Sequence, residues 1–127
     1  MRHLKARIAR LRSRIQLICC CQVPARHRDH VRFPHPVGIV IGDGTKIGRD
    51  VRIYQNVTIG LLENSSSATE NDYPRLEDEV CVYAGAVIAG PVRIGARSII
   101  GANAVITCDV PSDSIGYGYN QIGPRKT

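Results

Sequence analysis

The sequence lacks any run of about 18 consecutive apolar residues, and this absence excludes a helix that spans a membrane. Its first 32 residues also contain no phenylalanine, tyrosine or tryptophan, although they hold nine lysines and arginines. A groove for nucleic acid combines basic residues with aromatic side chains along one surface. Nucleic-acid binding is therefore not expected of this chain.

The net charge of +6 is confined to one end of the chain. Residues 1–32 carry nine basic residues and one acidic residue, a net of +8, and residues 33–127 carry eight and ten, a net of −2. The first 20 residues are too rich in arginine for a secretory signal. Five cysteines, an odd number, suit reduced thiols better than a disulfide framework, so a cytoplasmic protein is expected.

Branched aliphatic residues recur at every sixth position in two long stretches. These residues are Ile41, Ile47, Ile53 and Ile59, and then Leu76, Val82, Ile88, Ile94, Ile100 and Ile106. A period of six fits neither the 3.6 of a helix nor the alternation of a hairpin sheet. It is typical of a chain that turns a corner after each short strand. The pattern therefore predicts an all-β fold, a parallel β-helix whose coils bury their apolar faces against one another.

The repeat is interrupted once and ends before the C-terminus. Ile59 and Leu76 are seventeen positions apart, and the Ser/Asn/Glu-rich residues 61–75 between them predict a polar loop extruded from the coil. We expect a β-helix domain over residues 25–118, followed by a C-terminal tail at residues 119–127. Because so short a solenoid covers its ends poorly, oligomerisation is expected to supply part of the burial.

Residues 1–24 are expected to form a basic amphipathic α-helix. Apolar residues recur there at helical spacing, with basic residues between them: Leu4, Ile8, Leu11, Ile15 and Ile18. The favoured interpretation is that this row docks on the solenoid or on a partner subunit. Contact with a membrane surface, which basic amphipathic helices also support, is the less favoured alternative. The adjacent Cys19, Cys20 and Cys21 are interpreted as the apolar end of the helix.

Four segments carry a resemblance to a known family: PHPVGIVIGDGTKIG, IYQNVTIG, a loop ending DYPRL, and AGAVIAGPVRIGARSIIGANAVI. Over residues 20–118 the chain resembles the hexapeptide-repeat acyltransferases, of the serine acetyltransferase type and its short bacterial relatives in polysaccharide biosynthesis. The resemblance implies a left-handed β-helix, an unusual hand for parallel crossovers. It also implies a homotrimer with active sites between neighbouring subunits, and acetyl-CoA as the co-substrate.

His35 is the candidate catalytic residue. From the residues alone, a histidine between Pro34 and Pro36 needs no chemical role. By resemblance it matches the family's catalytic base, in the motif His-x-x-Gly-Ile-Val-Ile. Histidine can take a hydroxyl proton because its pKa lies near working pH, and the alcohol would then attack the thioester directly. A backbone N–H of a coil turn is expected to stabilise the developing oxyanion. Asp29 is the candidate acid partner on sequence distance.

The resemblance also implies contacts to the acceptor, a small molecule with a hydroxyl group, from Gln55, Asp72 and Tyr73. Tyr73 stands before Pro74, where serine acetyltransferases have a second histidine, and it is the second candidate catalytic residue. Its phenol can donate a hydrogen bond to the substrate. Pro34 occupies the place of an aspartate that holds the amino group of serine in those enzymes.

Small residues mark the expected acetyl-CoA site. By resemblance, Ala84, Gly85 and Ala102 line the groove because they let the pantetheine arm approach the backbone, and Arg97 is expected to meet the nucleotide phosphates. The alternative is that the small residues only permit the coil to turn. No histidine follows His35, so the three-histidine zinc pattern of carbonic-anhydrase-like β-helices is absent and no metal is expected.

The favoured function is an acetyl-CoA-dependent O-acetyltransferase of the serine acetyltransferase type. An alternative within the same class acetylates a hydroxyl of a sugar or polysaccharide precursor, and Pro34 and Tyr73 favour it. An alternative from another class is a catalytically inactive trimeric β-helix scaffold. The lack of a clear acid partner for His35 favours that scaffold.

Overall fold

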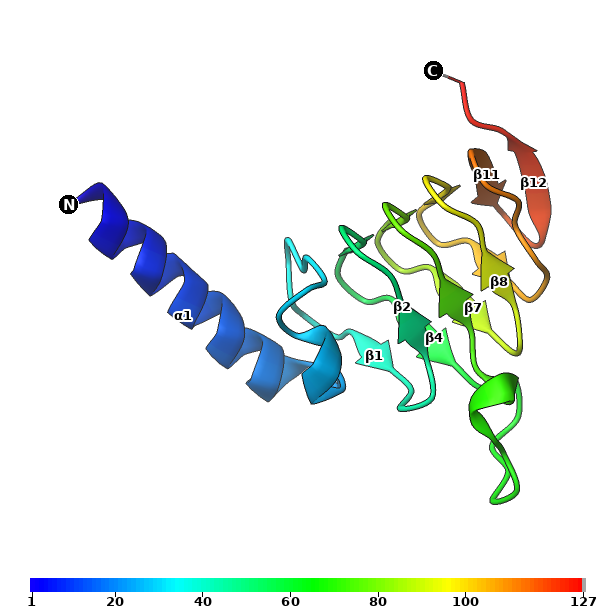
Figure 1. Cartoon of the computed structure of the whole chain (residues 1–127), viewed down its shortest axis with the longest axis horizontal. Coiled ribbons are helices and arrows are strands. Elements are labelled where there is room, and N and C mark those ends of the chain that lie inside the picture. The colour runs from blue at the N-terminus through cyan, green and yellow to red at the C-terminus, as the bar shows by residue number, and fades with distance from the viewer. Residues whose placement is uncertain (127) are drawn as a thin grey trace.

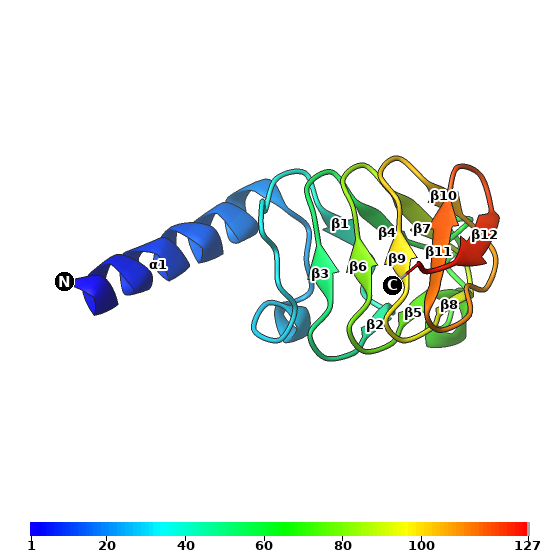
Figure 2. The same ribbon diagram turned by 90° about the horizontal axis from the view of Figure 1, so that it is seen from above.

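The structure is a computed structural model that describes residues 1–126, apart from the side chains of Ser13, Gln16 and Cys19. The interpretation of Cys19 as part of the apolar helix end therefore lies outside the described residues. An α-helix, α1 (Arg2–Cys20), projects from the first coil of a solenoid of short strands (Figures 1 and 2). No helix in the described part of the chain has the length and apolarity needed to cross a membrane.

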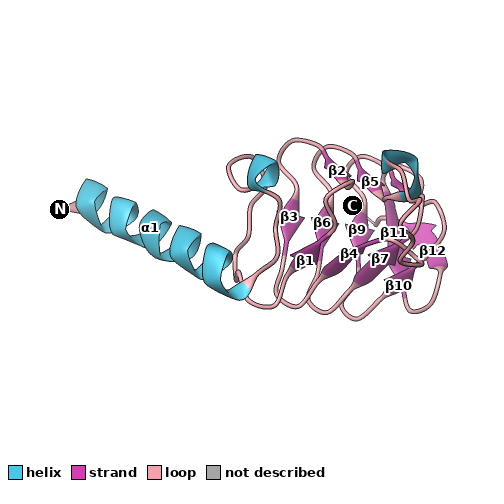
Figure 3. Ribbon diagram, turned by 90° about the horizontal axis from the view of Figure 1, so that it is seen from below, coloured by secondary structure: helices cyan, strands magenta, loops and turns pink. Residues whose placement is uncertain are grey.

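The short strands form three sheets along the length of the solenoid (Figure 3). The first sheet contains β1 (Val40–Ile41), β4 (Thr58–Gly60), β7 (Val87–Ala89) and β10 (Val105–Ile106). The second contains β2 (Lys46–Ile47), β5 (Arg75–Leu76) and β8 (Arg93–Ile94). The third contains β3 (Arg52–Ile53), β6 (Cys81–Val82), β9 (Ile99–Ile100), β11 (Ser114–Tyr117) and β12 (Gln121–Pro124). Consecutive strands from β1 to β10 belong to different sheets, and strands one coil apart pair in parallel, which is the predicted parallel β-helix.

The aliphatic residues of the six-residue repeat stack in columns inside the solenoid. Each coil of the solenoid is a triangle with one strand on each of its three sides. In the first complete coil, β1 to β3, the second residue of each strand points inward, so one aliphatic side chain is buried on each side. Burying such a side chain stabilises the fold by about 1.5–3 kcal/mol. The columns are Ile41–Ile59–Ile88–Ile106, Ile47–Leu76–Ile94 and Ile53–Val82–Ile100.

The coil turns at three corners, which we number in chain order. Corner I joins the first sheet to the second, and corner II joins the second to the third. Corner III joins the third sheet to the first. Backbone with positive φ recurs at corner II and at corner III, where Asn and Asp tolerate the left-handed conformation better than most residues. These positions are Asp50, Glu79, Arg97 and Asp113 at corner II, and Gly38, Asn56, Gly85 and Asn103 at corner III.

The extruded loop leaves the solenoid at corner I, between β4 and β5, and projects from the body of the molecule (Figure 1). It ends in a 3-10 helix, η2 (Glu70–Asp72). The carboxylate of Asp72 accepts hydrogen bonds from the backbone N–H of Thr69 at 2.8 Å and from its hydroxyl at 3.1 Å. The Asp72 carboxylate therefore fixes the start of its own helix.

Residues 22–32 form an incomplete first coil that covers the N-terminal end of the solenoid. The chain makes isolated parallel bridges at both ends of this segment, from Gln22 to Val40 and from Arg32 to Arg52. Between these bridges lies a 3-10 helix, η1 (Ala25–His27), in place of a strand beside β2. The segment therefore completes two sides of the triangle with backbone and leaves the third side to side chains.

Two histidines cover the open edge of β2. The Nε2 atoms of His27 and His30 lie 3.0 and 3.1 Å from the carbonyl oxygens of Thr45 and Ile47. A carbonyl oxygen only accepts, so both Nε2 atoms carry hydrogen and donate. An uncovered edge strand would leave these carbonyls available for pairing with another chain. The two imidazoles thus replace the backbone donors of a missing strand.

The stability of this cap is expected to depend on pH. His27 is 3% exposed, and its burial lowers the pKa of the imidazole below the ordinary value of 6.5. The unfolded chain then binds a proton more readily than the folded one, so the free energy of unfolding falls as the pH drops below about 6.5. Urea unfolding at a series of pH values measures this slope. The His27→Gln variant keeps an N–H donor without titrating, so the same slope in that variant would exclude His27 as its cause.

The C-terminal end of the solenoid is closed by a β-hairpin. Strand β11 pairs in parallel with β9 and in antiparallel fashion with β12, which lies within the residues assigned above to a tail. Gly118 and Asn120 turn the hairpin with φ of 54° and 52°. A Cβ atom on Gly116 would lie 3.0 Å from Cδ1 of Ile100, so glycine lets β11 seat directly on the last aliphatic layer.

Candidate active site

His35 lies on the approach to corner III, in the segment that enters the first complete coil. Pro34 and Pro36 fix the backbone φ on both sides of it. The N–H of Val37 donates to the carbonyl of His35 at 2.8 Å, and Gly38 turns the chain with a φ of 63°. The His35 side chain is exposed while Pro36 is buried. The backbone is thus held in place and the imidazole is open to a ligand.

Two tyrosines continue a column that begins at His35. The ring centroids of His35 and Tyr54 are 6.1 Å apart, and the rings of Tyr54 and Tyr83 are stacked at 5.1 Å. The negative charge that Cys81 carries when ionised, a hydrogen bond with Cys81 and burial together raise the pKa of Tyr83, which keeps its phenol protonated. This column was not predicted from the sequence. The signal was that each tyrosine directly follows an inward aliphatic residue, Ile53 or Val82.

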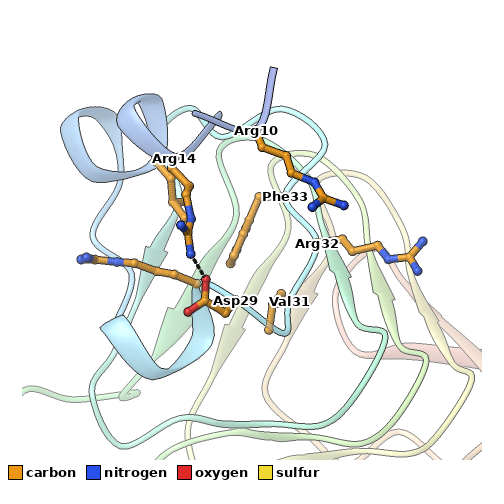
Figure 4. A pocket seen from close by; sticks show the side chains of 8 residues that line it. Arg10, Arg14, Asp29, Val31, Arg32 and Phe33 are labelled. Atoms are coloured by element: carbon orange, nitrogen blue, oxygen red, sulfur yellow. Dashed lines mark hydrogen bonds and ion pairs between the residues drawn. The ribbon is translucent and has the colours of Figure 1, made fainter. Parts of the chain in front are cut away.

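No acid is paired with the imidazole of His35 in the described part of the chain. The candidate acid, Asp29, forms an ion pair with Arg14 of α1 instead (Figure 4). His27 and His30 have carbonyl partners, whereas none of the described residues hydrogen-bonds to the ring of His35. The assignment of Asp29 as the partner of His35 is therefore wrong for this structure.

Corner III brings together four of the predicted site residues. The N–H of Gly85 donates to the carbonyl of Gln55 at 3.0 Å, and the N–H of Asn103 donates to the carbonyl of Ala84 at 2.9 Å. Gln55, Ala84 and Ala102 therefore occupy the same position on successive coils. The Oε1 atom of Gln55 is buried and has no hydrogen-bond partner among the described residues.

At the same corner, Gly85 leaves room for the side chain of Asn103 on the next coil. A Cβ atom at this position would lie 2.1 Å from the Oδ1 of Asn103, and the φ of Gly85 is 73°. Ala84 and Ala102 add only methyl groups beside it, so small side chains surround the carboxamide of Asn103 at this corner. An extended chain such as a pantetheine arm can approach such a surface closely.

Arg97 is not part of this group, because it lies at corner II. Strand β9 separates it along the chain from Ala102 at corner III. Its guanidinium donates to both carboxylate oxygens of Asp113, from Nε at 2.8 Å and from Nη2 at 2.9 Å. This hydrogen bonding lowers the pKa of Asp113 and raises the pKa of Arg97. The predicted phosphate contact therefore competes with an existing ion pair.

Tyr73 lies at corner I, at the opposite end of β1 from His35. Its ring covers the backbone of the first complete coil, since Cβ atoms on Gly42 and Gly44 would lie 2.6 and 2.1 Å from its ring carbons. It lines a cleft of about 500 Å³ together with Gln22 and Asp43. The structure therefore places the two candidate catalytic residues at different corners of one chain.

The described residues hold no cluster of three or more His, Cys, Asp or Glu side chains that could bind a metal ion. Corner III offers the exposed imidazole of His35, the buried amide oxygen of Gln55 and the small residues Ala84 and Ala102. These groups are suited to proton transfer and to binding an extended ligand.

Comparison with known proteins identifies what the repeat is similar to. The family model described as "Bacterial transferase hexapeptide (six repeats)" matches residues 73–108. Serine acetyltransferase of Mycobacterium tuberculosis is 40% identical over 88 residues, which are 69% of this chain and 37% of that protein. Serine acetyltransferase of Helicobacter pylori is 40% identical over 84 residues, 66% of this chain and 47% of that protein. The chain thus spans less than half the length of these curated relatives.

Solved structures give the same result for the fold. A truncated serine acetyltransferase apoenzyme superposes with a TM-score of 0.66 at 33% identity, over 73% of this chain and 38% of that one. A serine acetyltransferase in complex with CoA has a TM-score of 0.60 at 34% identity, over 69% and 34%. Soybean serine acetyltransferase complexed with serine has a TM-score of 0.63 at 33% identity, over 69% and 35%. The resemblance to hexapeptide-repeat acyltransferases of the serine acetyltransferase type is therefore confirmed.

Proposed function

Because the chain resembles the hexapeptide-repeat acyltransferases of the serine acetyltransferase type, we propose that it is an acetyl-CoA-dependent O-acetyltransferase that acts on the hydroxyl of serine. The proposal depends on the arrangement at corner III. There the exposed His35 lies one coil below Gln55, and Ala84 and Ala102 follow on the next two coils. The proposed hand of the β-helix is left, as in the family that the sequence resembles.

His35 is proposed to act as the general base. Its neutral imidazole takes the proton of the acceptor hydroxyl while the oxygen attacks the carbonyl carbon of the acetyl thioester. The C–S bond then breaks, and the imidazolium returns the proton to the departing thiolate, so that CoA leaves as a thiol. Such proton transfer contributes about 10²–10⁴-fold to a rate. No covalent enzyme intermediate is needed.

Acetyl-CoA is proposed to lie along corner III with its pantetheine arm over Ala84, Gly85 and Ala102. The small size of Ala84 and Ala102 supports this assignment, because their methyl groups leave the backbone of the corner open to close approach, while the place of a Gly85 Cβ is taken by the carboxamide of Asn103. Arg97 can reach the nucleotide phosphates only if its ion pair with Asp113 opens. The buried, unpaired Oε1 of Gln55 is proposed to accept a hydrogen bond from the acceptor.

The complete site is proposed to need two subunits of a homotrimer. His35 and Tyr73 lie at opposite ends of β1 within one chain, so both can touch one acceptor only if a neighbour supplies one of them. In that arrangement Tyr73 donates a hydrogen bond to the acceptor from the end of the extruded loop. Asp72 acts through the loop end, because its carboxylate is occupied by Thr69.

A sugar hydroxyl is the alternative acceptor, and two residues favour it. Pro34 cannot hold the amino group of serine in the way that the aspartate of serine acetyltransferases does. Tyr54 adds an aromatic face beside His35. A catalytically inactive scaffold is the remaining alternative, which the missing acid partner of His35 favours.

Release of free thiol from acetyl-CoA, measured with serine and with a panel of sugars, separates these functions. Turnover with serine is expected, and it should depend on both acetyl-CoA and the acceptor. Turnover with sugars alone would move the assignment to the alternative acceptor. If no acceptor releases thiol and acetyl-CoA does not bind in a calorimetric titration, the chain is a scaffold and the proposal is wrong.

A further inference from the structure

The apolar row of α1 is not covered by the solenoid. Its five residues follow one another at spacings of four, three, four and three, which places them on one face of the helix. Each is 47–60% exposed, whereas Leu17, which lies off the row, is 4% exposed. The prediction that the row docks on the solenoid is therefore wrong within this chain. The row consists of Leu4, Ile8, Leu11, Ile15 and Ile18.

Contacts at the C-terminal end of α1 explain why the apolar row faces away from the solenoid. Leu17 and Arg14 of α1 line a cleft of about 570 Å³ together with Asp29 of the incomplete first coil and Phe33, which follows that coil. Figure 4 shows Arg14, Asp29 and Phe33 around this cleft. Arg14 is paired with Asp29, and Leu17 is buried in the same core as Val31. At 100° per residue, the positions of Arg14 and Leu17 lie well to one side of the row. Anchoring by these two residues leaves the row open to solvent.

Both borders of the row are basic. Lys5 and Arg12 lie along one border, and Arg7 and Arg14 lie along the other, as helical spacing of the sequence requires. No acidic residue occurs before Asp29. A second copy of α1 would bring these like charges together at the positions that flank a coiled-coil seam, which disfavours self-pairing. The row also contains no polar residue that would fix the register of one particular helical partner.

We propose that α1 binds an anionic lipid surface. The helix lies in the plane of the interface, with the row in the acyl boundary and the flanking lysine and arginine side chains at the lipid phosphates. The charges on both borders match such a surface, since phosphates are available on either side of the helix. Membrane contact was the less favoured interpretation of the sequence. The exposed row contradicts docking on the chain's own solenoid, and the like charges on both borders disfavour pairing with α1 of a partner subunit. The proposal does not depend on the acetyltransferase activity.

Vesicle flotation of the full chain tests the proposal. The wild type is expected to float with phosphatidylcholine vesicles that contain phosphatidylglycerol, and to stay behind with pure phosphatidylcholine. The Ile8→Glu/Ile15→Glu variant removes two large apolar side chains from the row and should bind at least about tenfold more weakly. The matched control is Ala6→Glu/Ala9→Glu, which adds the same charge on the opposite side of the same helix. It should bind within about threefold of the wild type, a difference of no more than about 0.65 kcal/mol.

Three results would overturn the proposal. Equal loss of binding in both variants would show that charge alone holds the chain to the vesicles. Equal binding of the wild type to both kinds of vesicle would remove the role of the anionic lipid. A smaller mass by light scattering for the row variant alone, in the absence of vesicles, would show that the row binds a second copy of the chain. Thiol release from acetyl-CoA is measured separately on the same variants and should be unchanged.

Discussion

Replacing His35 by alanine is expected to lower kcat for acetyl transfer by about 10²–10⁴-fold, the usual contribution of a general base. The KM for acetyl-CoA should change little, because the proposed groove for the pantetheine arm lies on the coils above His35 and does not include its side chain. Initial rates of thiol release at saturating acceptor measure the effect. The imidazole is exposed, so its removal should leave the thermal unfolding temperature unchanged, and a thermal unfolding scan checks this.

A second histidine provides the matched control for that experiment. His3 lies on α1, outside the solenoid, and it is also exposed. The His3→Ala variant should keep the activity of the wild type. If His35→Ala retains more than about a tenth of the wild-type kcat, His35 is not the base, because even weak general-base catalysis exceeds tenfold.

Truncating Ile88 to alanine is expected to lower the free energy of unfolding by about 2–5 kcal/mol. Ile88 is fully buried and pairs with Ile59 on one side and Ile106 on the other, so the change opens a cavity in the middle of a column. Neighbouring coils cannot close over this gap without breaking the strand pairing on both sides. Equilibrium urea unfolding measures the loss.

The conservative change at the same position separates cavity formation from a general intolerance to substitution. Ile88→Val removes one methylene group and should cost about 0.5–1.5 kcal/mol. Equal losses for the two variants would contradict the packing described for this column. A loss below about 1 kcal/mol for alanine would show that the coils relax around the missing side chain.

The fold could be predicted because every six-residue repeat has the same strand-and-corner geometry. A branched aliphatic at every sixth position leaves the same side chain pointing inward on each side of each coil, and Ile41, Ile59 and Ile88 do stack in one sheet. The N-terminal helix followed from the spacing of its apolar row for a similar reason. Periodic patterns are read reliably because many residues report on one structural parameter.

Features that depend on single contacts could not be predicted. Leu17 stands outside the apolar row of α1, yet it alone among the described apolar residues of that helix is buried. The pairing of Asp29 with Arg14 and the cap made by His27 and His30 arise from tertiary placement, which no local pattern encodes. The ion pair between Arg97 and Asp113 is a contact of the same kind.

The extruded loop has a further consequence for how such a chain can change over time. Leu76 still stacks between Ile47 and Ile94, and Ile59 still stacks on Ile88, although residues 61–74 are inserted between the strands that carry them. Corner I therefore accepts additional chain without altering the register of any sheet. Segments of different length and composition can be exchanged there while the coils, and the surface of corner III, stay the same. A lineage built on this solenoid can thus change the loop that carries Tyr73 through one insertion, leaving the surface around Ala84 and Ala102 untouched.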